Sequence, residues 1–193
     1  MTQLLLKTSN LGCEVAGQVL FKDLNLEIKS GELLKIDGPN GCGKSTLLRC
    51  LVGIKLASSG SVERFEKCTF LGHKIGLNPL LTVSENILFS RAIAESSEHS
   101  IEVALERLDL YSYRNHLVGK LSAGLKQRCA LARIWVQACK IWLLDEPRSA
   151  LDAQSKELLN RLIIDHREEG GCIGMVSHTP VSFDDVQTLG LGL

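Results

Sequence analysis

The feature that most constrains the fold is the glycine-rich segment 38–45, which has the sequence Gly-Pro-Asn-Gly-Cys-Gly-Lys-Ser. It satisfies every fixed position of the phosphate-loop pattern G-x-x-x-x-G-K-[ST]. The apolar residues 33–37 before it predict a buried strand, and residues 46–52 after it predict a helix that ends at Gly53. This flanking context disfavours a chance match in an ordinary glycine-rich turn. The sequence therefore predicts a loop that binds a nucleoside triphosphate with magnesium.

The residue types of this loop suit that chemistry. Glycines let the backbone approach phosphate oxygens, and the amide groups together with the positive end of the following helix form an anion site. We expect Lys44 to place its ammonium between the β- and γ-phosphates, where it assists catalysis, and Ser45 to offer its hydroxyl to magnesium. The residues expected to contact ATP here are Gly38, Pro39, Asn40, Gly41, Cys42, Gly43, Lys44, Ser45 and Thr46.

Composition and charge narrow the classes of protein to consider. The 193 residues are 45% hydrophobic and 23% charged, which is ordinary for a globular chain with a substantial core. The formal net charge is zero, whereas a broad nucleic-acid interface usually carries a basic excess. We therefore expect no nucleic-acid partner. No apolar run approaches the roughly 18–20 residues that span a bilayer, so membrane association is expected only through a partner or a surface contact.

The seven cysteines are dispersed, and no C-x-x-C occurs. Scattered single cysteines of this kind are typical of reduced core residues. Cys42 is the exception, because it belongs to the phosphate loop. We expect a bound nucleotide to protect Cys42 from thiol reagents.

Strands and helices alternate along much of the chain. Residues 141–145 and 172–176 predict buried strands, residues 19–28 predict a half-buried strand, and residues 152–168 predict a helix. Such alternation predicts an α/β fold with a mostly parallel sheet. Residues 83–94 and the segment beginning at Ile101 predict two helices, and Ser122 is a suitable N-cap for a third.

These assignments predict one domain over residues 1–193. Its core would comprise residues 1–71 and 137–193, and residues 72–136 would form a mainly helical insertion.

Two acids directly follow the apolar run 141–144. Ligands of parallel sheets bind at the carboxyl ends of strands. A carboxylate at Asp145 could hold magnesium. If Glu146 continued the strand, it would point to the opposite face, where it could polarise a water that attacks the γ-phosphate. An acidic strand end capped by surface lysines is the plainer alternative. His178 follows the end of the strand predicted at 172–176.

Further segments occur in a specific order. Residues 121–125 are Leu-Ser-Ala-Gly-Leu, residues 145–147 are Asp-Glu-Pro, residues 149–152 are Ser-Ala-Leu-Asp, and His178 follows. They are similar to the L-S-G-G-Q signature, the catalytic acid segment, the D-loop and the switch histidine of ABC-type ATPases. With the phosphate loop, they make nearly the whole chain resemble the nucleotide-binding component of an ABC transporter, a P-loop NTPase core with a helical signature subdomain.

This resemblance implies a sandwich dimer, either a homodimer or a pseudo-dimer, which hydrolyses ATP with Mg²⁺. Each ATP would lie between the phosphate loop of one subunit and the signature segment of the other, where Ser122 and Gly124 would contact it. Glu146 would act as the catalytic base, and His178 would contact the γ-phosphate. A satisfied core histidine is the plainer alternative for His178. Integral membrane permease subunits would be the other partners.

The sequence departs from the family pattern at several positions. Leu125 replaces the signature glutamine, and Arg148 stands where the family usually has a small or aromatic residue. The position of the glutamine that contacts the metal in the family falls on His73, which is therefore a candidate metal contact. No tyrosine precedes Tyr111, so Cys13 or Val15 is considered instead of the usual adenine-stacking aromatic residue.

One subgroup is especially similar. Gly72-His73 with Gly76-Leu77, and residues 130–135 with the sequence Ala-Leu-Ala-Arg-Ile-Trp, resemble the ATP-binding subunit of the haem exporter of cytochrome c maturation. This resemblance implies a peripheral subunit on the cytoplasmic face of a bacterial inner membrane, or on the matrix side of the mitochondrial inner membrane. It would power haem export or the release of a haem-loaded chaperone.

Other functions remain open from the sequence. The chain could serve an ABC transporter of another cargo, act as a non-transport ABC ATPase, or bind nucleotide without turnover. Residues 73–81 are expected to dock a membrane subunit. A loop that merely packs on the phosphate-loop domain is the plainer alternative for them.

Overall fold

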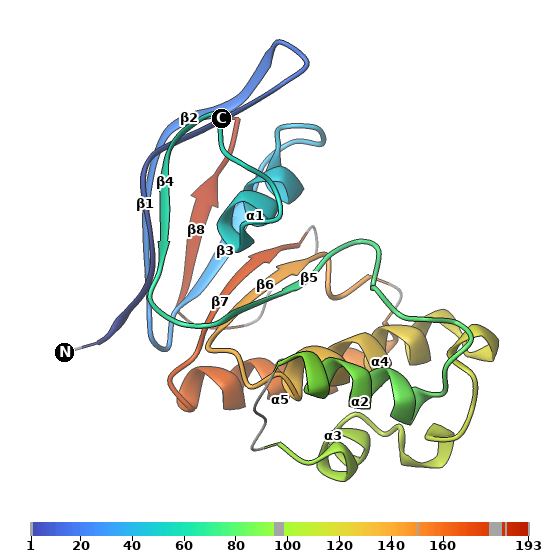
Figure 1. Cartoon of the computed structure of the whole chain (residues 1–193). Helices are drawn as coiled ribbons and strands as arrows, with labels where there is room; N and C mark the ends of the chain where they lie inside the picture. Colours follow the sequence, from blue (N-terminus) through green and yellow to red (C-terminus); the bar gives the residue numbers. More distant parts are fainter. Residues whose placement is uncertain (1, 95–98, 150, 178–182, 184, 193) are drawn as a thin grey trace. The chain divides into compact units, whose positions relative to one another are not determined.

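The computed structural model describes residues 2–94, 99–149, 151–177, 183 and 185–192 (Figure 1). The chain forms two compact units. The first, here called the sheet unit, comprises Met1–Phe70, Lys140–Pro147 and Asp165–Leu193. The second, here called the helical unit, comprises Leu71–Cys139 and Arg148–Ile164. The sequence-based division assigned residues 148–164 to the core, whereas their contacts place them in the helical unit.

The sheet unit contains a five-stranded sheet in the order β5-β6-β7-β3-β8. Strand β3 pairs in parallel with β7 and β8, and β6 pairs in parallel with β7. Both β6 and β7 are buried at every position, as expected for strands covered on both faces. The predicted α/β class with a mostly parallel sheet is thereby confirmed. The strand bounds are β3 Leu33–Asp37, β5 Cys68–Leu71, β6 Ile141–Asp145, β7 Cys172–Val176 and β8 Val186–Gly190.

A separate antiparallel sheet has the order β2-β1-β4, with β1 Leu4–Val15, β2 Gln18–Lys29 and β4 Ser59–Arg64. Ala16 (φ 51) and Gly17 (φ 81) connect β1 to β2 with the positive φ values that a two-residue hairpin turn favours. Within β2, Leu24 and Leu26 are half-buried and Asn25 is exposed, which confirms the predicted alternation. The sequence did not indicate that these strands form a second sheet.

Helix α1 (Lys44–Val52) follows the phosphate loop and contacts β6 and β7. Its buried Leu47, Leu48 and Leu51 join a core cluster that also draws on both sheets. The helix ends as predicted at Gly53, whose backbone is left-handed (φ 87) and whose N–H donates to the Cys50 carbonyl. This packing fixes the start of α1 at the carboxyl ends of the parallel strands.

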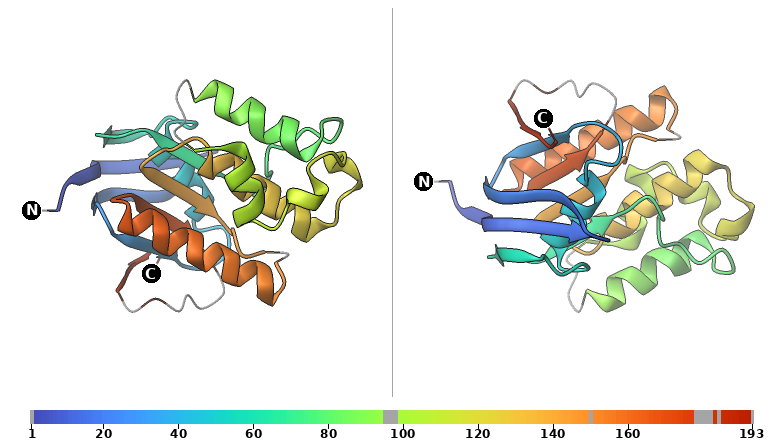
Figure 2. Two further views of the ribbon diagram at one scale, coloured as in Figure 1. Left: turned by 90° about the horizontal axis from the view of Figure 1, so that it is seen from below. Right: turned by 90° about the horizontal axis from the view of Figure 1, so that it is seen from above.

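In the helical unit, α2 (Val83–Ile93), α3 (Ile101–Arg107) and α4 (Ala123–Trp135) contact one another. Figures 1 and 2 show these green to yellow helices side by side. The two helices predicted from residue 83 and residue 101 are confirmed. Helix α2 begins with a capping box, in which the Thr82 side chain accepts from Glu85 N–H and the Glu85 carboxylate accepts from Thr82 N–H.

Helix α5 (Ala153–Glu168) begins in the helical unit and continues into the sheet unit. Two 3₁₀ turns, Tyr111–Tyr113 and Val118–Lys120, lie between α3 and α4. Among the residues that the structure describes, no helix has the length and apolar character needed to cross a bilayer.

Candidate ATP-binding site

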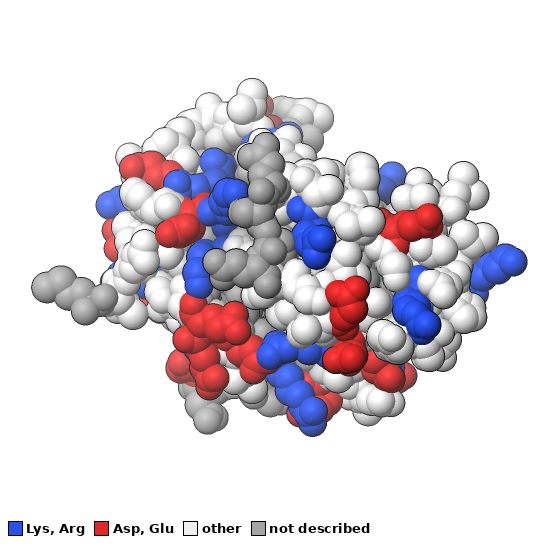
Figure 3. Space-filling view, turned by 60° about the horizontal axis from the view of Figure 1, so that its bottom comes forward, with Lys and Arg blue, Asp and Glu red and all other residues white. Residues whose placement is uncertain are grey.

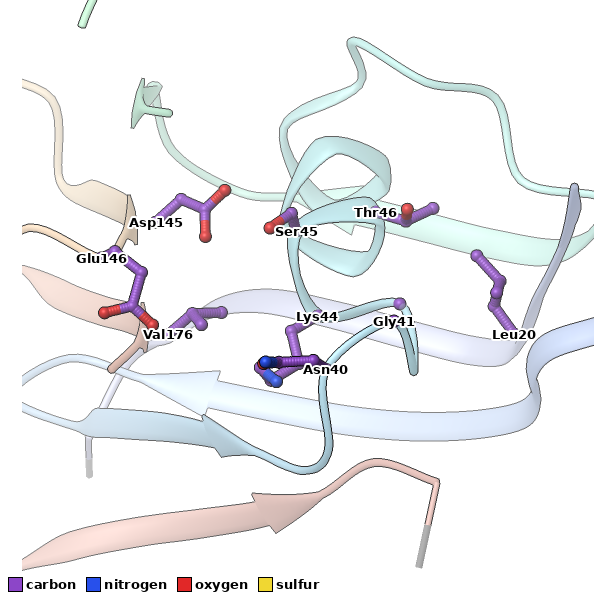
Figure 4. A pocket seen from close by; sticks show the side chains of 10 residues that line it. Leu20, Asn40, Gly41, Lys44, Ser45, Thr46, Asp145, Glu146 and Val176 are labelled. Atoms are coloured by element: carbon purple, nitrogen blue, oxygen red, sulfur yellow. The ribbon is translucent and has the colours of Figure 1, made fainter. Parts of the chain in front are cut away.

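A cavity of about 250 Å³ lies in the sheet unit beside the phosphate loop (Figure 4). Its walls come from the loop, the start of α1, the strand β2 and the ends of β6 and β7. Its position at the carboxyl ends of parallel strands is where such sheets bind ligands. The lining residues are Leu20, Asn40, Gly41, Gly43, Lys44, Ser45, Thr46, Asp145, Glu146 and Val176.

Two glycines of the loop are sterically required. A Cβ at Gly38 (φ 145) would lie 2.2 Å from the Leu191 carbonyl oxygen, and a Cβ at Gly43 (φ 103) would lie 3.0 Å from the Leu20 Cβ. Both φ values also belong to the region that disfavours side chains. The loop therefore keeps its curvature only with glycine at these positions.

Lys44 places its ammonium at the mouth of this loop. The residue is 7% exposed, and its Nζ donates to the carbonyl oxygens of Gly38 at 2.6 Å and Pro39 at 2.9 Å. These carbonyl acceptors carry no net charge, whereas phosphate oxygens are negatively charged and attract the ammonium by a full charge–charge interaction as well. A phosphate that enters the cavity can therefore compete for Lys44.

Asp145 ends β6 and is 4% exposed. Its Oδ2 is buried and has no hydrogen-bond partner among the described residues. A buried carboxylate oxygen without a donor is costly, and an oxygen-seeking cation or its bound water would satisfy it. Figure 4 shows the Asp145 carboxylate pointing toward Ser45. This pair of oxygen donors fits Mg²⁺.

The backbone of Glu146 differs from the strand conformation considered in the sequence analysis. It does not continue the strand, because its backbone is left-handed (φ 53) and its N–H donates to the Val176 carbonyl at 3.0 Å. The expectation that Asp145 and Glu146 point to opposite faces of one strand is therefore wrong. Both line the same cavity, with Glu146 beside Val176 in Figure 4.

The apolar wall of the cavity was not identified from the sequence. Leu20 of β2 lines it, beside Gly43 of the loop. Cys13 is 2% exposed and packs in the core cluster, whereas Val15 is 42% exposed. Nothing in the local pattern singles out Leu20, because pairing within the antiparallel sheet brings it to the loop.

The signature segment lies in the helical unit. Ser122 caps α4, and its Oγ accepts from Leu125 N–H at 3.3 Å. Ser122 and Ala123 are exposed, Gly124 is half-buried, and the first turn carries no acid. These features leave the positive end of α4 open to an anion.

The structure describes two of the three other residues that the sequence singled out. His73 is exposed in the helical unit. Arg148 donates from Nη1 to Asn160 Oδ1 at 2.8 Å, which ties it to α5. His178 lies outside the described residues. The metal role of His73 and the γ-phosphate role of His178 stay predictions.

The surface charge agrees with the neutral composition. Figure 3 shows basic and acidic side chains interspersed on the face it presents, with neither sign covering that face.

Comparisons with known proteins agree with this geometry. Residues 21–149 match the family model described as ABC transporter. The cytochrome c biogenesis ATP-binding export protein CcmA of Shewanella oneidensis is 37% identical over 186 residues, covering 90% of this chain and 86% of the relative. CcmA of Aliivibrio fischeri is also 37% identical, covering 93% and 95%.

Among solved structures, a dimeric ATP-binding cassette in a post-hydrolysis state with ADP and Pi superposes with a TM-score of 0.80. It is 27% identical, with 90% of this chain and 88% of that chain covered. The family resemblance inferred from the motifs is confirmed. The chain belongs to the ABC transporter family, as one of its ATP-binding subunits.

Proposed function

We propose that this chain is the ATP-hydrolysing subunit of an export complex for cytochrome c biogenesis, and that it powers haem export or the release of a haem-loaded chaperone. One observation carries the catalytic part. Lys44, Ser45, Asp145 and Glu146 line a single cavity at the carboxyl ends of parallel strands. The names of the bacterial relatives support the export part.

Different residues of the cavity would bind the phosphates, hold the metal and activate the attacking water. The loop amides and Lys44 bind the phosphates of ATP. Ser45 and Asp145 would hold Mg²⁺, which when bound neutralises phosphate charge. Glu146 orients a water toward the γ-phosphate and accepts its proton, while ADP carries away the electron pair of the broken bond. His178 would contact the γ-phosphate, and His73 would assist at the metal.

The second half of each site would come from another subunit. Ser122 and Gly124 at the start of α4 would bind the γ-phosphate of ATP held by the partner. The exposed N-cap of α4 and its acid-free first turn support this role. The chain would therefore act as a homodimer or a pseudo-dimer that closes on ATP and opens after hydrolysis.

A pocket of about 190 Å³ in the helical unit supports docking of an integral membrane permease subunit. Gly76, Asn78 and Leu81 line it and belong to the predicted docking segment 73–81. Phe89 and Ile93 of α2 also line it and are 61% and 63% exposed. Exposed apolar side chains beside a pocket suit a partner helix.

Docking of this kind would hold the chain at the cytoplasmic face of a bacterial inner membrane. The corresponding place in an organelle would be the matrix side of the mitochondrial inner membrane.

The test combines activity with partner capture. The wild-type chain should release phosphate from ATP with Mg²⁺, and Glu146→Gln should not. Affinity purification of tagged Glu146→Gln chain from its native membranes with ATP should recover membrane proteins of cytochrome c maturation. Recovery of a different permease would reassign the cargo. Absence of hydrolysis in the wild type would overturn the proposal.

Cysteine crosslinking tests docking at the helical unit separately. Single cysteines at Asn78 and at Phe89 should crosslink to the permease, and a cysteine at the exposed Glu63 of β4 serves as the matched control. Crosslinks only from the control position would contradict docking at this pocket.

A further inference from the structure

Lys35 and Asp37 form an ion pair on β3, directly before the phosphate loop. The Lys35 Nζ donates to Asp37 Oδ2 at 2.9 Å, and the two side chains are 20% and 47% exposed. Strand β3 lies inside its sheet, between β7 and β8, and its other residues, Leu33, Leu34 and Ile36, are buried. A charged pair therefore stands in an otherwise apolar interior strand, and none of the roles assigned above explains it.

The pair lies on the face of β3 that turns away from α1. Side chains alternate along a strand, so Lys35 and Asp37 share one face, and Leu34 and Ile36 share the other. Leu34 and Ile36 join the core cluster that contains the buried leucines of α1. Neither charged residue lines the cavity. Any effect of the pair on a nucleotide must therefore pass through the loop or through its electric field.

Asp37 holds the first residue of the phosphate loop. Its Oδ1 accepts from Gly38 N–H at 2.9 Å, and its backbone carbonyl accepts from Leu191 N–H at 2.8 Å. The Gly38 carbonyl in turn accepts from Lys44 Nζ at 2.6 Å. The Asp37 carboxylate thus orients the residue whose carbonyl holds the Lys44 ammonium.

The charge of Asp37 acts across the loop. Hydrogen bonds from Lys35 and from Gly38 N–H lower the pKa of Asp37 below the ordinary 3.8. The positive charges of Lys35 and Lys44 lower that pKa further. The carboxylate is therefore ionised at neutral pH and interacts with the Lys44 ammonium. Phosphates that approach Lys44 meet the same negative charge, which repels them, and the ammonium of Lys35 offsets that repulsion.

We propose that Lys35 and Asp37 are a positioning pair that sets the ATP affinity of the phosphate loop from the face of β3 that turns away from α1. Asp37 fixes the start of the loop through Gly38 N–H. Lys35 holds the carboxylate in that geometry and screens its negative charge from the phosphates. This inference rests on the ATP-binding part of the proposed function.

Substitutions at the two positions separate charge from hydrogen bonding. Lys35→Gln leaves the charge of Asp37 unscreened. Asp37→Asn removes that charge and keeps an oxygen for Gly38 N–H, whereas Asp37→Ala removes both. The double variant Lys35→Gln with Asp37→Asn carries neither charge. Lys7→Gln is the matched control, because Lys7 pairs with Glu27 at 3.1 Å between β1 and β2 and neither residue lines the cavity.

Each variant is measured for the Kd and KM of ATP with Mg²⁺, for kcat and for the thermal midpoint. For Lys35→Gln we expect Kd and KM to rise about threefold to fivefold, the upper range for one exposed ion pair, with kcat unchanged. Adding Asp37→Asn should return Kd to the wild-type value. Asp37→Asn alone should bind ATP at least as tightly as wild type, and Asp37→Ala more weakly than Asp37→Asn. Lys7→Gln should leave Kd unchanged.

Salt dependence is a readout that a merely structural ion pair would not change. The Debye length falls from about 10 Å at about 0.1 M salt to about 3 Å at about 1 M. The ratio of the Kd of Lys35→Gln to that of wild type should therefore shrink toward one over this range. A ratio that is the same at both salt concentrations would overturn the screening role.

Other outcomes also overturn the proposal. One is an equal Kd for Lys35→Gln and Lys7→Gln, and another is a double variant that binds ATP as weakly as Lys35→Gln. If Lys35→Gln does not fold, the two Asp37 variants decide, and an equal Kd for Asp37→Asn and Asp37→Ala overturns the positioning role. A wild type that binds and hydrolyses ATP beside an unaffected Lys35→Gln overturns the pair alone. A wild type that does not bind ATP overturns the proposed function as well.

Discussion

Asp145 and Glu146 are consecutive in the sequence, yet both side chains line one cavity, because the left-handed backbone of Glu146 (φ 53) breaks the alternation of β6. The Val176 carbonyl, which accepts from Glu146 N–H at 3.0 Å, holds this conformation. A buried acid and a half-buried acid thus stand side by side. Mutation can separate the metal role proposed for Asp145 from the water role proposed for Glu146.

Glu146→Gln should abolish turnover and keep ATP binding. The amide cannot accept the proton of the attacking water, so kcat should fall by about 10²–10⁴-fold, the usual contribution of a general base. Phosphate release and equilibrium binding of a fluorescent ATP analogue give the two quantities. Glu63→Gln, at an exposed position of β4, is the control. Unchanged hydrolysis in Glu146→Gln would show that Glu146 does not act as the catalytic base.

Lys44→Ala should weaken ATP binding itself. Each hydrogen bond to a charged group contributes about 1.5–3 kcal/mol, so Kd should rise by at least about tenfold. Gly38 and Gly43 still favour the curvature of the loop, which loses the two hydrogen bonds from Lys44 Nζ to the Gly38 and Pro39 carbonyls. Binding is measured by titration calorimetry, with Lys22→Ala, at an exposed position of β2, as the control for loss of a surface charge. An unaltered Kd would show that Lys44 does not reach the phosphates.

Cys42 should react with iodoacetamide at neutral pH, and ATP with Mg²⁺ should slow that reaction. Burial raises the pKa of Cys129 to about 12 and that of Cys172 to about 12, so these thiols should react only after unfolding. Mass spectrometry of labelled peptides gives each rate. Half-buried Cys68, in β5, is an internal control whose rate nucleotide should not change. Equal rates for Cys42 with and without nucleotide would contradict its place at the site.

Gly171→Ala should destabilise the sheet unit through a clash with His166. A Cβ at Gly171 would lie 2.2 Å from the His166 Nε2. That ring cannot move away, because it stacks on Trp142 with centroids 4.0 Å apart. We expect a loss of about 1–3 kcal/mol in the free energy of unfolding, as for other overpacked sites.

A double-mutant cycle tests this cause. Denaturant unfolding should show a smaller cost of Gly171→Ala in a His166→Ala background, where the obstructing ring is gone. An equal cost in both backgrounds would point to the backbone instead of the ring.

The capping box of α2 should make stability depend on pH. Hydrogen bonds from Thr82, first from its N–H and then from its hydroxyl, lower the pKa of Glu85 below the ordinary 4.5. A carboxyl whose pKa is lower in the native state stabilises that state above its ordinary pKa, and this stability is lost as the pH falls through the native pKa. The stability gap between wild type and Glu85→Gln should therefore be full at pH 7 and narrow only in acid.

Urea unfolding over a pH series measures this gap. Glu66→Gln, at an exposed position outside any helix, is the control. A gap that widens toward acid pH would contradict the capping role.

The sequence was most informative where one residue decides the local geometry. Gly53 predicts the end of α1, and Ser122 predicts the cap of α4. In each case the deciding contact lies within a few residues of the chain. Local patterns therefore sufficed for these elements and for the glycine loop.

The remaining features depend on residues far apart in the chain. Glu146 turns because Val176 of a neighbouring strand accepts its N–H, and Leu20 reaches the cavity through β2. Arg128 meets Ser155 across 27 positions. A local sequence pattern does not show which residues far apart in the chain will contact one another. The antiparallel sheet and the shared orientation of the two acids were therefore not predictable from the sequence pattern.

The contact between Leu191 and the phosphate loop has a consequence for variants of this protein. Leu191 N–H donates to the Asp37 carbonyl at 2.8 Å, and its own carbonyl oxygen occupies the space beside Gly38. Because β8 lies at the edge of its sheet, a substitution that loosens β8 would also loosen the contact that Leu191 makes with the phosphate loop. Such a variant would lose ATP affinity although every residue that lines the cavity is unchanged.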